Sequence, residues 1–239
     1  MSIAGDTTRA RRDTRRFSRV AAAVLMPVGP LAVALLRFII PFDPPAVAAA
    51  ADPARLEVVM ALGAVATFTL VPGAYAAVHL TRRYQPVLTV WVAALLIPGY
   101  LGLAGLAVVD GIAPAGVRRG VDPAAVTAIY DGVGELAAVT VFFGVFLIGH
   151  ILGTVLLGIL SFRARLMPRA FALLFAVSQP LHLTAVMLAN NWLDLLAWSL
   201  TAAGMAFLAL RVLRTPDEEW DLPPLTGRTS ERASHAIGS

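Results

Sequence analysis

The sequence contains no cysteine and no lysine, and charged residues make up only 14% of its 239 residues. Without cysteine there are no disulfides, thiolate nucleophiles or cysteine-ligated zinc and iron–sulfur centres; without lysine there is no Schiff-base chemistry and no P-loop lysine. Hydrophobic residues reach 58%, above the roughly 45–50% of ordinary soluble domains. This composition excludes a water-soluble globule and indicates a polytopic membrane protein.

Several catalytic motifs are also missing. The chain has no HExxH, no GxSxG, no Walker A loop, no GxGxxG opening a helix after a strand, and no paired glutamates inside an apolar stretch. Standard metalloprotease, serine hydrolase and nucleotide-driven activities therefore have no residues to carry them. Nothing in the sequence favours an enzyme.

Six apolar stretches are long enough to cross the hydrocarbon core of a bilayer, which takes about 20 residues. They are residues 20–41, 57–80, 87–109, 134–160, 170–190 and 193–213. Short connections make neighbouring helices antiparallel, so the predicted fold is an all-α transmembrane bundle over residues 20–213. Residues 1–19 and 214–239 are expected to be disordered arms, with an acidic docking motif around Trp220 as an alternative for the second.

Turn chemistry marks the breaks between these stretches. Asp43-Pro44-Pro45, Asp52-Pro53 and Asp122-Pro123 each place a potential N-cap before a proline at the first helical position. Asp52-Pro53 starts the helix that contains residues 57–80. Asp122-Pro123 starts a short amphipathic helix in the longest loop, and this helix ends near Tyr130.

Arginine is concentrated at one end of the predicted bundle. That end holds Arg9, Arg11, Arg12, Arg15, Arg16, Arg19, Arg82, Arg83, Arg163, Arg165, Arg169, Arg211 and Arg214, whereas carboxylates gather at the other. Both termini are therefore predicted to be cytoplasmic, with the protein in the cytoplasmic membrane. The first arm is expected to bind anionic lipid and not nucleic acid, because no aromatic residue is interleaved before Phe17.

A cleaved signal peptide ending near Ala46-Val47-Ala48 is the alternative for the first span. Its apolar run is longer than the 7–15 residues or so of a signal h-region, which favours a retained helix.

Two histidines lie inside the predicted spans. Counted from their shared loop, His150 and His182 are both roughly 17 Å deep at 1.5 Å per residue. Intramembrane ionisable groups are costly and usually face the bundle interior. We therefore expect the two rings at one level on adjacent helices.

Their neighbours extend this polar seam. Gln179, His182 and Asn190 share a predicted helix face, with Pro180 inside it, and Thr154 shares a face with His150. A proline inside a helix frees a carbonyl, which neighbouring groups must satisfy. The simplest interpretation is that Gln179 or this carbonyl binds one of the imidazoles.

Two further polar groups lie near the acidic end of the bundle. Arg37 is expected to extend outward to Asp43, Asp110 or Asp194. Asp194 itself is expected to cap the last span.

Glycine and proline form two further patterns. Gly149, Gly153 and Gly158 are spaced for close approach of another helix, within this chain or from a second copy in a homo-oligomer. The steps Pro72-Gly73 and Pro98-Gly99 interrupt two neighbouring spans at similar depth. Such paired interruptions are typical of transporter binding sites, and simple packing kinks are the alternative.

The last three spans resemble a family of membrane proteins. The segments 149–158, 178–183 and 195–198, with the Val71-Pro72-Gly73 and Ile97-Pro98-Gly99 steps, are similar to six-helix integral membrane proteins of high-GC bacteria that share a domain of unknown function. The resemblance covers about residues 20–213 and implies the six-helix fold, but no activity and no site residues.

Three functions stay open. The first is a small transporter or membrane ligand-binding protein that uses His150, Gln179 and His182, with Thr154 and Asn190 nearby. The second is a haem or redox protein with His150 and His182 as axial ligands, which requires the small residues at 149 and 153 to open a slot. The third is a non-catalytic assembly subunit. Only the second of these needs a cofactor.

Overall fold

The computed structural model describes residues 13–222, and within that range it contains ten α-helices and no strand. Six helices are long and apolar enough to cross a membrane: α1 (Arg15–Ile39), α3 (Pro53–Thr81), α4 (Pro86–Asp110), α7 (Ala137–Arg163), α8 (Arg169–Met187) and α9 (Asn191–Leu213). Four are short: α2 (Pro45–Ala51), α5 (Ile112–Arg118), α6 (Pro123–Gly134) and α10 (Asp217–Trp220). The chain is a multi-pass membrane protein, as its composition predicts.

The contacts among the six long helices form a closed ring. Each packs mainly against two others, in the order α1, α3, α4, α7, α8, α9 and back to α1. The interior is filled by large buried side chains: Met26, Leu70, Leu96, Leu157, Phe175, Trp198, Met205 and Leu208. Large apolar side chains such as Phe68, Val90 and Val108 lie exposed on the outside, as expected of a surface that faces lipid.

Helix bounds differ from the apolar stretches by several residues. Helix α1 begins at Arg15, so part of the segment predicted to be a disordered arm is helical. Helix α8 ends at Met187 because Ala189 adopts a left-handed conformation (φ 50°), and the Asn190 amide then bonds back to the Ala185 carbonyl. This is the usual backbone geometry of a helix C-terminus. Hydropathy counts apolar residues and does not detect such ends.

Two of the three predicted caps are present. The Asp52 carboxylate accepts a hydrogen bond from the Arg55 amide at the start of α3, and Asp122 accepts from the amides of Ala124 and Ala125 at the start of α6. At α2 the residue in the cap position is Pro44, which has no side-chain hydrogen bond to offer.

The long helices run unbroken through their internal prolines. Helices α3, α4 and α8 continue through Pro72, Pro98 and Pro180, so the prediction of interrupted spans is wrong. The glycines beside the first two prolines instead allow close packing. A Cβ atom on Gly73 would lie 3.0 Å from the Leu25 carbonyl oxygen of α1. The Pro72-Gly73 and Pro98-Gly99 pairs therefore serve helix packing, which is the alternative to a transporter binding site.

The small residues of α7 lie where another helix backbone crosses. A Cβ atom on Gly149 would lie 2.5 Å from the Leu95 carbonyl oxygen of α4, and one on Gly158 would lie 2.6 Å from Ala176 of α8. A Cβ atom on Gly153 would lie 2.9 Å from Leu96 of α4. The predicted close approach is confirmed, and this glycine face is covered by the chain's own α4 and α8.

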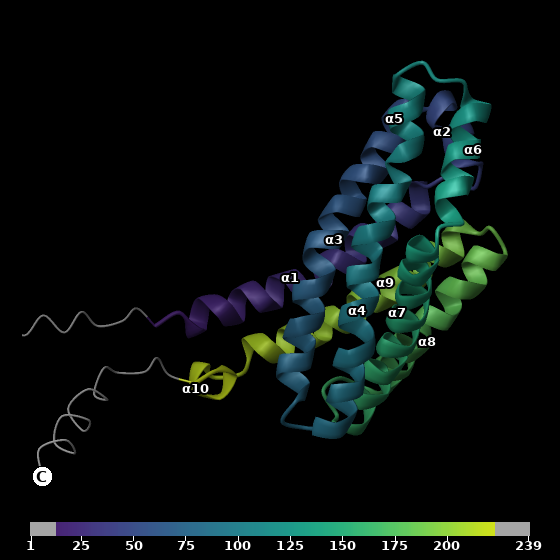
Figure 1. Ribbon diagram of the computed structural model, residues 1–239. Coiled ribbons are helices and arrows are strands. Elements are labelled where there is room, and N and C mark those ends of the chain that lie inside the picture. The colour runs from purple at the N-terminus through teal and green to yellow at the C-terminus, as the bar shows by residue number, and fades with distance from the viewer. Residues whose placement is uncertain (1–12, 223–239) are drawn as a thin grey trace, which may run out of the picture.

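The ends of the bundle differ. Helices α2, α5 and α6 lie together at one end, whereas α10 and the ends of the described chain lie at the other (Figure 1). A small apolar cluster of Ala46, Ala113 and Val126 joins the three short helices. Because Arg82, Arg83, Arg163 and Arg214 border the end with α10, we call it the arginine-rich end. Which side of the membrane it faces stays a prediction.

The close contact between α4 and α7 leads us to predict how a glycine substitution changes stability. Replacing Gly149 with alanine should lower the free energy of unfolding by about 1–3 kcal/mol, because the new methyl group meets backbone that cannot move aside. Gly144, in the same helix, has nothing within 4 Å of its Cβ position. Gly144→Ala should therefore be neutral or stabilising, by up to about 1 kcal/mol. Denaturant unfolding in detergent micelles compares the two, and equal effects would contradict this account of the packing.

Candidate functional site

The structure brings His150 and His182 together inside the ring. Their ring centroids are 5.8 Å apart. The His150 side chain, on α7, is completely buried. Trp198 of α9 completes the group, with its ring centroid 6.1 Å from His150 and 5.4 Å from His182. The expectation that the two histidines meet at one level is therefore met, and α9 contributes a third ring.

His150 is bound by its own helix. Its Nδ1 lies 2.5 Å from the Phe146 carbonyl oxygen, and the Phe146 ring stacks on the imidazole at 4.2 Å. A carbonyl oxygen only accepts hydrogen bonds, so Nδ1 carries the proton and Nε2 presents a lone pair in the neutral ring. That lone pair has no partner in the described structure.

His182 belongs to a charged link across three helices. Its Nδ1 lies 2.6 Å from Asp194 Oδ1, and the other carboxylate oxygen accepts from Arg37 Nε at 2.6 Å. Asp194 is fully buried, whereas the Arg37 and His182 side chains keep 20% and 12% exposure. The link therefore runs from the surface at the end opposite α10 to the histidine pair.

This link decides between the roles expected for Arg37 and Asp194. Of the three carboxylates proposed for Arg37, it pairs with Asp194. The prediction that Asp194 caps the last span is wrong, because the Asn190 side chain accepts from the Leu193 amide and caps α9. Asn190 also lies beyond the end of α8 and is exposed, so it does not share a face with Gln179 and His182.

Asn191 is a structural residue that sequence reasoning missed. Its Nδ2 lies within hydrogen-bonding distance of the carbonyl oxygens of Arg37, Phe38 and Ile40, at 2.9–3.0 Å. The last carbonyls of a helix have no partner within that helix. Asn191 therefore fastens the end of α1 to the start of α9, beside the Arg37–Asp194 pair.

Gln179 pairs with α9 and not with a histidine. Its Nε2 donates to Thr201 Oγ1 at 2.8 Å, and the Ser178 hydroxyl lies 2.8 Å from the same oxygen. The interpretation that Gln179 binds an imidazole is therefore wrong. The sequence placed Gln179 on the correct face, but the partner on α9 could not be known without the packing of the helices.

Four buried polar atoms near the histidines lack a hydrogen-bond partner: His150 Nε2, Thr154 Oγ1, Gln179 Oε1 and Trp198 Nε1. The phenol of Tyr100 lies beside Thr154. Buried polar atoms are nearly always satisfied by protein or water, since an unpaired one costs about 1–3 kcal/mol. The four atoms include both a donor, the indole N–H, and acceptors, so they suit water or a small polar molecule.

The haem alternative does not fit this arrangement. It needs a slot at Gly149 and Gly153 for the porphyrin, but α4 fills the space beside both glycines. We therefore assign no haem role to His150 and His182.

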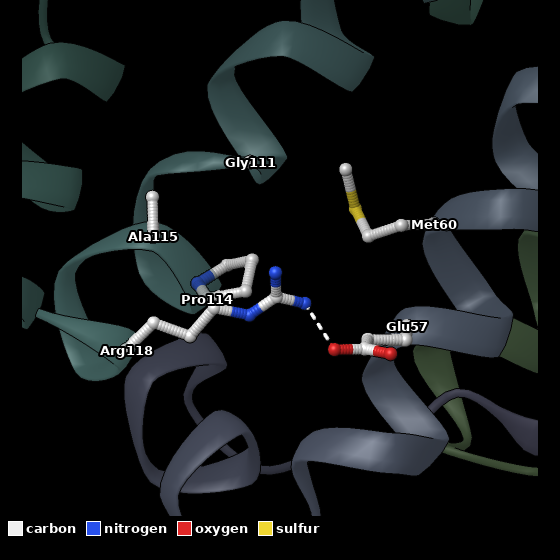
Figure 2. Close-up of a pocket in the computed structure, with 6 residues that line it drawn as sticks. All are labelled: Glu57, Met60, Gly111, Pro114, Ala115 and Arg118. Atoms are coloured by element: carbon white, nitrogen blue, oxygen red, sulfur yellow. Dashed lines mark hydrogen bonds and ion pairs between the residues drawn. The ribbon is translucent and has the colours of Figure 1, made fainter.

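The cavity of about 420 Å³ shown in Figure 2 lies away from this group. It lies between α3 and α5, where Arg118 bonds to Glu57 with both side chains well exposed. In the same end of the molecule, Tyr130 of α6 donates to Asp110 at 3.0 Å. Burial and the nearby Asp110 carboxylate raise the pKa of Tyr130 to about 12, so its phenol keeps its proton at neutral pH.

Comparison of the chain with known protein families, with curated proteins and with solved structures found no match. The family resemblance given by the last three spans therefore stays a prediction.

The Arg37–Asp194–His182 link leads us to predict that loss of the Asp194 charge lowers stability. Asp194→Asn should lower the free energy of unfolding by about 3 kcal/mol, because it removes the charge that compensates a partly buried arginine. Asp43→Asn, at an exposed carboxylate of the same end, should change it by less than about 0.5 kcal/mol.

The double variant Arg37→Gln with Asp194→Asn separates the charge effect from a packing effect. It leaves no uncompensated charge, so it should be less destabilised than the sum of the two single changes. Additive losses in denaturant unfolding would show that the pair is not coupled.

Proposed function

We propose that the protein is a small proton-coupled membrane transporter whose site lies between α7, α8 and α9. The observation that carries this proposal is the set of unpaired polar atoms on α7, α8 and α9, together with the contact of His150 with His182, which is bound to a buried, charge-compensated carboxylate. Buried ionisable groups in membrane helices are expensive and commonly mark proton or substrate pathways.

The proton route in this proposal begins at the partly exposed Arg37–Asp194–His182 link. Asp194 orients the His182 ring through Nδ1, which leaves Nε2 free to exchange a proton. The unpaired His150 Nε2 is the acceptor, and a ring separation of 5.8 Å is within reach of transfer through one water molecule. Protonation of His150 then changes the charge inside the cluster.

The solute in this proposal is small and carries both donor and acceptor groups. Gln179 Oε1 and His150 Nε2 accept hydrogen bonds, Trp198 Nε1 donates one, and Thr154 does either. Helices α4 and α7 approach each other closely at Gly99 and Gly149, beside His150, which favours a small solute. The assembly-subunit alternative loses its main support, since the glycine face of α7 is already covered within the chain.

Proteoliposomes of the full chain test the proposal. Proton entry is measured with an internal pH dye, under a membrane potential, with a panel of small polar solutes outside. We expect at least one solute to increase proton entry. Either His150→Gln or His182→Gln should reduce that increase at least about tenfold, because positioned acid–base groups contribute roughly 10²-fold or more.

The matched control is Thr67→Val. Thr67 Oγ1 is also a buried polar atom without a partner, but it lies on α3. This variant should transport as the original chain does, and thermal unfolding checks that all variants are folded. If no solute changes proton entry and both histidine variants behave like the original, the histidines are packing groups and the proposal fails.

A further inference from the structure

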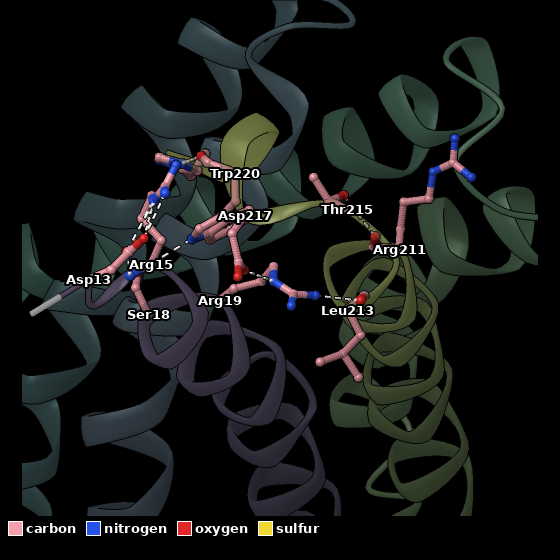
Figure 3. A network of polar contacts seen from close by, with 10 residues as sticks. Asp13, Arg15, Ser18, Arg19, Arg211, Leu213, Thr215, Asp217 and Trp220 are labelled. Atoms are coloured by element: carbon pink, nitrogen blue, oxygen red, sulfur yellow. Dashed lines mark hydrogen bonds and ion pairs between the residues drawn. The ribbon is translucent and has the colours of Figure 1, made fainter. Parts of the chain in front are cut away.

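The segment after α9 folds back onto the arginine-rich end (Figure 3). Trp220 of α10 is only 4% exposed, and its indole N–H donates to Ser18 Oγ at 3.3 Å. Its carbonyl oxygen lies 2.7 Å from His79 Nε2, and the two rings are 4.4 Å apart. The acidic motif around Trp220, predicted as part of a disordered tail or as a docking motif, therefore docks on this chain's own α1 and α3. The rest of the predicted tail, and Arg9, Arg11 and Arg12 of the arm, lie outside the described residues.

Two arginines at the start of α1 form ion pairs with carboxylates of the same chain. Arg19 Nε donates to Asp217 at 2.7 Å, and its Nη1 donates to the Leu213 carbonyl oxygen at 2.5 Å. Arg15 forms an ion pair with Asp13 at 2.6 Å. Hydrogen bonds from Arg15 lower the pKa of Asp13 to about 2, so this carboxylate stays charged near neutral pH.

These contacts lie at the end of a membrane-spanning helix. Helix α1 enters its apolar stretch directly after Arg19, and Phe17 beside it is 76% exposed. Lipid headgroups therefore reach the same level as Arg15 and Arg19. Phosphate oxygens bind guanidinium groups with the same paired geometry as carboxylate oxygens. Asp217 thus occupies an arginine that an anionic headgroup could also bind.

We propose that Arg15, Arg16 and Arg19, which we call the basic surface, bind anionic phospholipid headgroups, and that α10 is an internal competitor that these lipids displace. The acidic residues Asp217, Glu218 and Glu219 give α10 its charge. In a bilayer without anionic lipid, α10 stays on the basic surface. In an anionic bilayer, the headgroups take the arginines and α10 is released. This proposal is independent of the transport function.

Spin-label distances in the full chain test it. The chain has no cysteine, so Tyr84→Cys and Leu222→Cys, at exposed positions, give two unique labels. In phosphatidylcholine nanodiscs we expect one narrow distance distribution. With phosphatidylglycerol added, the ratio of docked to released α10 should fall about fivefold, since release of α10 frees Arg19 and one arginine near an anionic surface favours release about fivefold. An unchanged distribution would overturn the proposal.

A charge-swapped variant is the matched control. Arg19→Asp with Asp217→Arg keeps an ion pair but removes the attraction of residue 19 for anionic lipid, so its response should be at least about fivefold smaller. An equal response would overturn the role of Arg19. If the swapped chain does not dock in phosphatidylcholine, Glu218→Gln with Glu219→Gln replaces it, and this variant should release α10 at a lower phosphatidylglycerol fraction. An unshifted release fraction would also overturn the proposal.

Free phosphate separates a lipid surface from a simple anion site. Inorganic phosphate added to phosphatidylcholine nanodiscs should leave α10 docked, because a dilute ion lacks the surface potential of an anionic bilayer. Release by phosphate alone would show an anion site in place of the lipid surface and would overturn the proposal.

Discussion

The bundle depends on how one buried carboxylate is compensated. Asp194 is completely buried near the start of α9, where an unpaired charge would cost several kcal/mol. Arg37 from α1 and His182 from α8 each take one of its oxygens. The amide nitrogen of the adjacent Asn191 lies within hydrogen-bonding distance of three carbonyl oxygens at the end of α1. The first turn of α9 therefore carries both the buried carboxylate and the amide that binds the last carbonyl groups of α1. These contacts hold α1, α8 and α9 together at this point.

The same arrangement makes the two histidines unequal. His182 is bound by the buried Asp194 carboxylate, which is also paired with the partly exposed Arg37. His150 is bound by a neutral carbonyl and stacks with the rings of Phe146 and Trp198. His182 therefore has a carboxylate partner and His150 has none. In the transport proposal, one histidine is partly exposed and the other is enclosed. The close contact of α4 and α7 keeps this region narrow.

Hydropathy and residue spacing were enough to predict the six spans, the caps at Asp52 and Asp122, the close approach at Gly149 and Gly153, and the meeting of His150 with His182. These follow from helix geometry along one stretch of chain. The partners of Asp194 and Gln179 could not be predicted, because each depends on which helices are neighbours in the ring. The positions of Asn190 and Trp220 were missed because backbone turns at the ends of α8 and α9, not hydrophobicity, decide where the chain goes next.

Helix α1 connects the two polar regions. Arg19 at one end bonds to Asp217 and to the last turn of α9, and Arg37 at the other bonds to the first turn of α9. The two helices are antiparallel and packed along their length, so a rigid shift of α1 along α9 would strain both attachments. The attachments differ in kind: Arg37 binds a fully buried carboxylate, and Arg19 binds a carboxylate that is partly exposed. Because water and salt screen exposed pairs far more than buried ones, the Arg19 end is the weaker of the two. The Arg37–Asp194 pair is therefore the firmer of the two attachments between α1 and α9.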